Sequence, residues 1–261
     1  MTSLTRKQRE IAERHNHFLT IARELLRDEG FHQLSMDRVA ELAEYSKGTV
    51  YQHFNCKEEM VGQLCINAMQ RLHALGQRAV RYPGSHRERL LAFFIANDVF
   101  QQMEEDAVCN MQNYQHDQII SKVSDSTRTR HEELMHSIFS TVKSIVEDAM
   151  RDGDLPNEPT SAADMVFGFW SLNHGAQALR TNQYPLENMG ISEPGAATMS
   201  VLQSLLDGLG WKKDQLQHAT ALEHVKGIRD ALLSQQTATN EFDTTPPVKT
   251  KTSQSAFETT A

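Results

Sequence analysis

The sequence predicts an all-α protein, because apolar residues recur at intervals of three and four along most of its 261 residues. No stretch alternates between apolar and polar residues as a strand would, and no internal repeat or Gly-rich phosphate loop is present. Gly30, residues 82–84 (Tyr-Pro-Gly) and residues 152–156 (Asp-Gly-Asp-Leu-Pro) interrupt the periodicity and are typical of helix ends. We therefore expect a series of helices packed around a sizeable core.

The charge is unevenly distributed along the chain, whose formal net charge is −8. Residues 1–82 hold 12 Lys and Arg against 10 Asp and Glu, whereas residues 83–261 hold 14 against 24. The negative net charge argues against general nucleic-acid binding. The slightly basic N-terminal part on an acidic remainder, however, fits a protein that contacts DNA through one end only.

Cysteine usage and the absence of long apolar runs bear on the compartment. Cys56, Cys65 and Cys109 are an odd number without a pairing pattern, which is typical of a reducing cytoplasm. The N-terminus lacks the apolar run of a signal peptide, and no stretch approaches the roughly 20 consecutive apolar residues of a membrane span. We therefore expect a cytoplasmic protein without a membrane partner.

The first 57 residues are expected to form three helices. Residues 7–29 form the first helix, which stops at Gly30. Ser35 is a suitable N-cap for a short second helix, and Glu44-Tyr45 forms the turn before the third. Two short helices joined by a tight turn are typical of a helix-turn-helix motif.

The third helix is predicted within Ser46-Lys47-Gly48-Thr49-Val50-Tyr51-Gln52-His53-Phe54. At about 100° per residue, Val50 and Phe54 share one face, and the other side chains are small or hydrogen-bonding. A helix that buries so little and presents so many hydrogen-bonding groups is typical of one that inserts into a groove of DNA.

The remaining chain is expected to be helical as far as about residue 234. The periodicity predicts a long fourth helix that ends near Val80, and an irregular stretch is expected around Cys109–His116. Further helices are predicted over residues 86–105, 125–151, 161–182, 196–211 and 213–234. The segment after them is rich in Thr and Ser and is expected to be disordered.

Several short sequence motifs (words, below) occur in a fixed order in the first quarter of the chain. They are Ala22 and Leu25, Gly30-Phe31, Leu34-Ser35-Met36, Val39-Ala40, Ala43, Ser46–Phe54 and Lys57-Glu58-Glu59-Met60. With these words, residues 18–64 resemble the N-terminal domain of the TetR (tetracycline-repressor-like) family of transcriptional regulators. Two residues depart from the family pattern, since Glu44 replaces a glycine and Tyr45 replaces a small aliphatic residue. We expect Glu44 to adopt a positive φ, which is strained for a residue other than glycine.

The resemblance implies a helix-turn-helix DNA-binding domain (1–57) and a helical regulatory, ligand-binding and dimerisation domain (58–234). The composition of the remaining residues predicts a disordered tail (235–261). The resemblance further implies a ligand-responsive regulator, more often a repressor than an activator, which binds a palindromic operator in double-stranded DNA as a homodimer. The dimer would form through helices 161–182 and 196–211 as a four-helix bundle. On periodicity alone, these apolar faces could instead fill the core of the monomer.

Eight residues are candidates for DNA contact. Gln52 and Thr49 suit base edges, because an amide pairs with adenine and a threonine methyl contacts thymine, and Gly48 allows close approach of the backbone. The resemblance implies phosphate contacts from Lys47, Tyr51, His53 and Lys57, with one more from Ser35. Alternatively, Tyr51 and His53 could serve only to pack the small domain.

The resemblance also implies an effector pocket between the fourth helix and the helices that follow. An aromatic- and Met-rich set with histidines as polar groups is predicted to line an apolar cavity for an unknown, apolar small molecule. The set is Phe94, Met103, Met111, Tyr114, His131, Met135, Phe139, Phe167, Trp170 and His174. The same residue types would also serve an ordinary helical core.

We expect neither catalysis nor a metal or other cofactor. His131 and His136 resemble a zinc-protease pair, but they are five residues apart and lie about 140° apart around a helix, so they cannot share a metal. No serine lies in a Gly-x-Ser-x-Gly elbow. The alternative to a DNA-binding regulator is a helical ligand-binding or scaffold protein that has lost DNA binding.

Cys56 is a candidate for redox sensitivity. It stands at the N-cap of the fourth helix, with Glu59 placed as in a capping box. A helix N-terminus beside Lys57 would favour a thiolate, whose oxidation would perturb the DNA-binding domain. The other interpretation is a poor cap with no regulatory role.

Overall fold

The computed structural model describes residues 5–157, 160–181 and 184–212, and no strand occurs among them. In chain order the elements are α1 (Arg6–Glu29), α2 (Met36–Leu42), α3 (Lys47–Tyr51), α4 (Lys57–Ala79), α5 (His86–Met103), α6 (Glu105–Tyr114), α7 (Asp117–Ile120), α8 (Asp125–Arg151), α9 (Ala162–Thr181), a 3-10 helix (Glu187–Met189) and α10 (Pro194–Gly208). The all-α prediction is confirmed. The predicted helix over 213–234 and the predicted tail over 235–261 lie outside the described residues.

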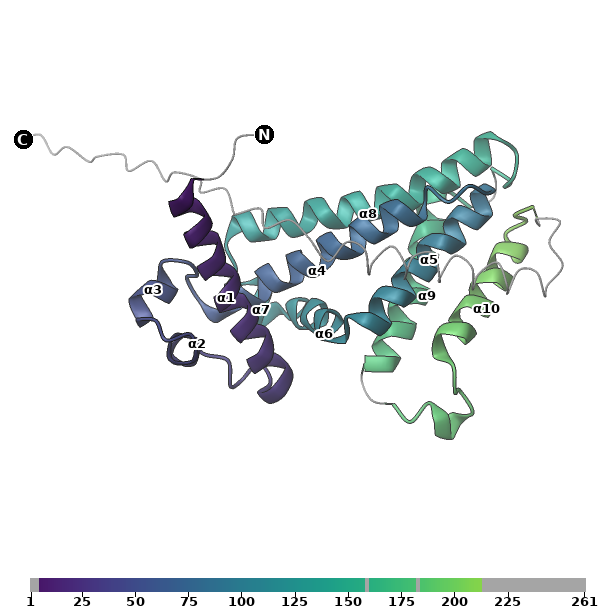
Figure 1. Cartoon of the computed structure of the whole chain (residues 1–261). Helices are drawn as coiled ribbons and strands as arrows, with labels where there is room; N and C mark the ends of the chain where they lie inside the picture. Colours follow the sequence, from purple (N-terminus) through teal and green to yellow (C-terminus); the bar gives the residue numbers. More distant parts are fainter. Residues whose placement is uncertain (1–4, 158–159, 182–183, 213–261) are drawn as a thin grey trace, which may run out of the picture.

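The helices form a small group at one end and a larger group beside it (Figure 1). We call α1–α3 the head and α4–α10 the body. The long helix α4 leaves the head and runs through the body alongside α8, while α9 and α10 lie at the side of the body away from α3 (Figure 1). A displacement of α4 would therefore move both the head and the helices of the body that pack against it.

The core is continuous between the head and the first half of α4. Phe18, Val39 and Val50 of the head are fully buried, and they belong to the same apolar cluster as Met60 of α4 and Tyr114 of α6. A second cluster packs α5 and α8 against α9 and α10. The predicted boundary between residues 57 and 58 thus lies beside a shared core, and the division into domains stays a prediction.

Two glycines allow the neighbours of α4 to pack closely against it. A Cβ atom at Gly62 would lie 2.8 Å from Cγ2 of Thr127, and one at Gly76 would lie 2.7 Å from Cε2 of Phe93. Real Cβ atoms do not approach other atoms so closely, so a side chain at either position would push α8 or α5 away from α4.

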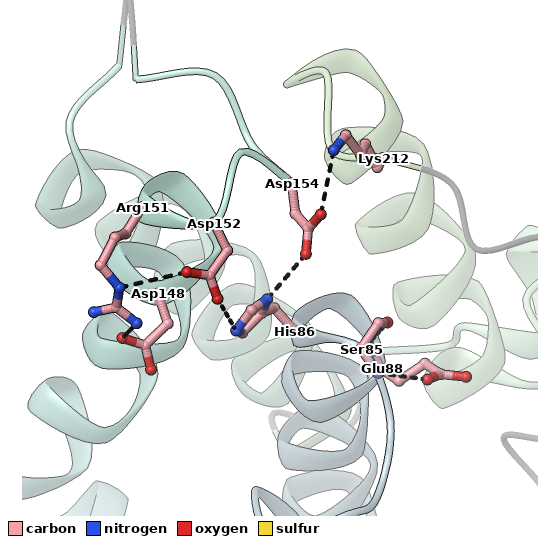
Figure 2. A network of polar contacts seen from close by, with 8 residues as sticks. All are labelled: Ser85, His86, Glu88, Asp148, Arg151, Asp152, Asp154 and Lys212. Carbon is pink, nitrogen blue, oxygen red and sulfur yellow. Dashed lines mark hydrogen bonds and ion pairs between the residues drawn. The ribbon is translucent and has the colours of Figure 1, made fainter.

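A polar network ties together three chain segments at the far end of the body (Figure 2). The ring of His86, at the start of α5, lies between two carboxylates of the α8–α9 connection, with Nδ1 3.0 Å from Asp154 and Nε2 3.4 Å from Asp152. Lys212, beyond α10, lies 3.5 Å from Asp154. The hydrogen bond from His86 holds the pKa of Asp154 below its usual value. This network fixes how α10 is placed on α5 and α8.

One predicted irregular stretch is a regular helix. The residues around Cys109 form α6, which begins at Glu105 and ends at Tyr114. It packs mainly against α4, with smaller contacts to α1, α5 and α7. The prediction of an irregular stretch over these residues is therefore wrong.

The turn of the helix-turn-helix has the strain that its sequence predicts. Glu44 has φ 57°, and it is the one residue other than glycine with a positive φ in the described part of the chain. The backbone N–H of Tyr45 donates to the carbonyl of Ala40 at 3.0 Å, and that of Glu44 donates to Glu41 at 3.1 Å. These two hydrogen bonds form a Schellman motif, in which glycine is usual at the position of Glu44.

We expect Glu44→Gly to stabilise the protein by about 1 kcal/mol, because a left-handed conformation costs a residue with a Cβ about that much. Urea unfolding followed by circular dichroism measures the change. Glu41→Gly is the matched control within helix α2, and it should destabilise by roughly 0.5–1 kcal/mol. A loss of stability in Glu44→Gly would contradict the strain at this turn.

Candidate nucleic-acid interface

Helix α3 is fixed to the head by two side chains and by its N-cap. Val50 is fully buried and Phe54 is 2% exposed, as the face that they share predicts. The Oγ of Ser46 accepts a hydrogen bond from the backbone N–H of Thr49 at 3.1 Å and lies 2.7 Å from the Thr49 hydroxyl. These contacts hold a five-residue helix that would not be stable alone.

The outer side of α3 is open to solvent. Lys47, Gly48, Tyr51 and Gln52 are exposed, and Thr49 is half-buried. Tyr51 keeps 45% of its surface exposed, although a tyrosine that served only to pack the head would be covered. The structure therefore brings five of the eight candidate residues to one accessible surface, which we call the α3 surface.

The charge of Lys47 is balanced within the head. Its Nζ lies 2.5 Å from the carboxylate of Asp37 in α2 and 5.9 Å from the centroid of the Tyr51 ring. Ser35 lies half-buried at the N-cap of α2, where its Oγ accepts from the backbone N–H of Arg38 at 3.2 Å. An anion at the α3 surface would compete with Asp37 for Lys47.

His53 and Lys57 are placed mainly to hold the head together. The His53 ring lies 5.3 Å from the ring of buried Phe18 and 5.7 Å from that of His15. The Nζ of Lys57 donates to the carbonyl of Phe31 at 3.0 Å and lies 4.3 Å from the Phe31 ring centroid. Both side chains are half-buried, so packing accounts for most of their contacts.

His15 lies inside the head behind α3. It is 8% exposed, and its ring stacks on that of Phe54 with a centroid separation of 4.4 Å. Burial, followed by the nearby charge of His53, lowers the pKa of His15 to about 4. Sequence reasoning missed this residue because it lies beside the apolar stripe of α1.

We expect the head to lose stability as the pH falls from about 6.5 to about 4. The unfolded chain binds a proton at His15 in this range, whereas the folded protein does not, so stability rises with pH and is complete above about 6.5. The shift corresponds to about 3 kcal/mol. Urea unfolding at pH 7 and pH 4.5 should give a smaller difference for His15→Phe than for wild type. His17→Phe, at an exposed position on the same helix, should leave the difference unchanged.

The structure does not support the prediction that Cys56 is an activated thiolate. Cys56 occupies the N-cap of α4 but makes no capping hydrogen bond, and burial raises the pKa of its thiol. The capping box is also wrong, because the Glu59 carboxylate accepts from the backbone N–H and the hydroxyl of Ser124, both at 2.8 Å, and from Thr127. Glu59 therefore ties α4 to the start of α8.

Helices α9 and α10 carry an apolar face that nothing in the described chain covers. The exposed side chains are Phe167 (62%), Trp170 (44%) and Leu179 (47%) on α9, and Val201 (54%) and Leu205 (37%) on α10. Large exposed apolar surfaces usually mark an interaction site. We call this surface the α9–α10 face.

Three residues predicted to line the effector pocket belong to this outer side. Phe167 and Trp170 are exposed on α9 rather than buried in the body core, and their part in an effector pocket stays a prediction. The half-buried His174 lies beside Trp170, with ring centroids 6.4 Å apart. The apolar periodicity of α9 indicated that these residues are covered, but not whether the cover is the body or another molecule.

Four other predicted pocket residues pack together between α4, α6 and α8. Tyr114 is 1% exposed, and its ring lies 4.6 Å from that of His131. Burial lowers the pKa of His131, and Met111 and Met135 pack against the same core. The hydroxyl of Tyr114 is buried without a hydrogen-bond partner among the described residues. These side chains form a filled core in this structure.

The remaining predicted residues do not complete a pocket. Phe94 is buried against Phe169, and Phe139 is partly buried in the same cluster. The side chain of Met103 lies outside the described part of the chain. Phe94 borders a cavity between α5, α9 and α10 whose free volume of about 20 Å³ has room for about one water molecule. The predicted set is thus spread over several environments.

A larger cleft lies where the head meets the body. Its volume is about 700 Å³, within the range of ligand sites, and α1, α4 and the α5–α6 junction line it. Its lining is polar and includes Asn16 and Arg23 of α1, Asn67 and Arg71 of α4, and residues 104–106. Arg71 donates to both carboxylate oxygens of Glu104 from Nε, at 3.0 and 2.8 Å. Sequence reasoning did not find this site.

Among the described residues, no group of three or more His, Cys, Asp or Glu is arranged to hold a metal ion. Likewise, none of the helices in the described ranges is long and apolar enough to cross a membrane.

Comparison with known proteins agrees with the helix-turn-helix. Residues 18–64 match the family model of bacterial regulatory proteins of the tetR family. The HTH-type transcriptional activator FasR of Mycolicibacterium smegmatis is 34% identical over 80 residues, which make up 31% of this chain and 36% of that protein. The match therefore spans little more than a third of this curated relative.

Solved structures share the fold across head and body. A protein of unknown function from Rhodococcus sp. RHA1 superposes with a TM-score of 0.61 at 20% identity, over 75% of this chain and 95% of that one. A tetR-family regulatory protein from Rhodococcus RHA1 superposes with a TM-score of 0.60 at 14% identity, over 77% and 99%. The family model thus matches the helix-turn-helix at residues 18–64, and the helical fold of head and body is shared with these solved structures.

Proposed function

We propose that this protein is a cytoplasmic transcriptional regulator that binds a palindromic operator as a homodimer. The α3 surface is the observation that carries the proposal. Tyr51 and Gln52 are exposed on a helix whose other side is anchored by Val50 and Phe54. Side chains so presented would reach base edges and phosphates in the major groove.

The α9–α10 face supports the dimer. One head reads only a few base pairs, so a specific site requires a second head. Two α9–α10 pairs would pack as a four-helix bundle and cover the exposed Phe167 and Trp170. The heads would then lie in successive major grooves about 34–36 Å apart on a palindrome.

The cleft between head and body supports a polar effector rather than the apolar one predicted from the sequence. Its walls come from α1 of the head and from α4 and the α5–α6 junction of the body, so a ligand there would favour one orientation of the head. If such a ligand lowers the affinity for DNA, bound DNA must lower the affinity for the ligand by the same factor.

Selection of bound sequences from a random duplex pool tests the proposal. Enrichment of a palindrome by the purified protein at near-physiological salt would support the two-headed interpretation and identify the operator. A folded, dimeric protein that enriches nothing, with or without added cell extract, would contradict it. Loss of the palindrome on addition of extract would indicate an effector that releases DNA.

The alternative is a helical ligand-binding or scaffold protein without DNA binding. Salt dependence separates the two, because phosphate contacts release counterions and make log K fall steeply with log salt. Repression and activation are separated by a reporter gene that carries the selected operator. The curated relative is an activator, whereas the family resemblance favoured a repressor.

A further inference from the structure

Most basic side chains around α3 are already engaged within the head. Lys47 pairs with Asp37, Lys57 is bonded to the carbonyl of Phe31, and Arg38 donates two hydrogen bonds to Glu29 at 2.5 and 2.7 Å. A cation that already pairs with a carboxylate or donates to a carbonyl must give up that contact to bind a phosphate, so it contributes less to the binding of a polyanion. Between residues 30 and 57, all three Lys and Arg side chains are therefore engaged, which leaves little free positive charge beside α3.

Arg14 of α1 is an exception. It forms no ion pair within the described residues, and Glu10, one turn earlier, is bonded to Arg6 instead at 2.9 Å. The Nε of Arg14 is buried without a hydrogen-bond partner in the same part of the chain. Its guanidinium carbon lies 5.3 Å from the centroid of the Tyr45 ring, close enough for a cation–π contact.

Tyr45 holds this arginine beside α3. It immediately precedes the N-cap Ser46, and its ring meets the fully buried ring of Phe18 edge-on, with centroids 5.4 Å apart. One edge of the Tyr45 ring is thus fixed by the core, while 42% of the side chain remains exposed. An aromatic ring fixed in this way positions a guanidinium at the surface with little loss of side-chain freedom on binding.

We infer that Arg14 and Tyr45 form a phosphate-binding site at the edge of the α3 surface, with Arg14 as the contact and Tyr45 as the positioning residue. The inference rests on the proposed DNA binding, because the phosphate belongs to the backbone of the bound duplex. Guanidinium binds phosphate oxygens through paired hydrogen bonds, which lysine cannot reproduce. The contact reads no base, so it acts on all sequences alike.

Arg81 provides a control outside the head. It is exposed, it forms no ion pair among the residues that the structure describes, and it follows the end of α4 that lies away from the head. Arg14→Gln and Arg81→Gln therefore remove the same charge from the head and from the far end of the body.

The test is titration of a random-sequence duplex and of the selected palindrome at several salt concentrations. Arg14→Gln should weaken binding to both duplexes by about tenfold and reduce the slope of log K against log salt by about one for each head. Arg81→Gln should leave affinity and slope unchanged. Tyr45→Phe, which keeps the ring, should resemble wild type, whereas Tyr45→Val should lose part of the slope.

An unchanged slope in folded Arg14→Gln, with wild type binding duplex normally, would overturn the inference and leave the proposed function standing. Wild type that binds no duplex in a salt-dependent manner would overturn the proposed function and this inference with it. Thermal unfolding of each variant confirms that the head is folded. Because Arg14 is half-buried, Arg14→Lys serves as a second variant, which should keep the slope but bind more weakly than wild type.

Discussion

Substitution of Phe167 and Trp170 by Asp is expected to convert the protein into a monomer and to reduce operator affinity by roughly 10²–10⁴-fold. Both side chains are largely exposed on α9, and in a dimer each pair of charges would be buried without partners. The heads themselves would be unchanged, so each would still bind a half-site weakly. Sedimentation equilibrium measures the oligomeric state, and titration of the palindrome and of a half-site measures the affinity.

Ser144→Asp is the control for this prediction. It adds a charge at an exposed position of α8, away from the α9–α10 face, and it should change neither the mass nor the affinity. A double variant that remains dimeric would show that the α9–α10 face is not the interface. A monomer with undiminished affinity for the full palindrome would instead contradict two-headed binding.

Tyr51→Ala is expected to reduce operator binding by at least about a hundredfold while the protein stays folded. The ring is 45% exposed and lies against Lys47, so its loss should change the free energy of unfolding by less than about 1 kcal/mol. The large effect on binding follows if the hydroxyl and ring contact the duplex. Fluorescence anisotropy with the labelled palindrome measures the affinity, and urea unfolding measures the stability.

Two further variants sharpen the interpretation of Tyr51. Tyr51→Phe removes only the hydroxyl and should lose about tenfold if that group donates to a phosphate. Tyr184→Ala removes an equally exposed tyrosine outside the head and should leave binding unchanged. An unaltered isotherm for Tyr51→Ala would exclude this residue from the interface.

Local features of the head could be predicted from the sequence because a few neighbouring residues determine them. The spacing of Val50 and Phe54 set the buried side of α3, and Ser46 set its N-cap. Glu44 has the positive φ expected where the family has glycine. Hydrogen bonds and dihedral angles within a single turn decide each of these, and such interactions depend little on distant parts of the chain.

The candidate site was predicted less completely than the fold. His53 and Lys57 match the family words, but their partners Phe18 and Phe31 come from α1 and from the turn after it. No sequence pattern identified Arg14 as a functional residue, because a single arginine on a helix is not distinctive. Its significance arises from the ring of Tyr45, 31 positions further along the chain.

The sequence by itself determined the helical class, the position of most helices and the resemblance of residues 18–64 to the TetR family, because periodicity, caps and turn residues are local properties. Only the tertiary structure decided which way each apolar stripe faces. Phe167 and Tyr114 both lie on apolar stretches, yet one is exposed on the α9–α10 face and the other is buried against α4. The hydrophobic effect requires apolar surface to be covered but does not specify the cover, which only the packing of distant helices provides.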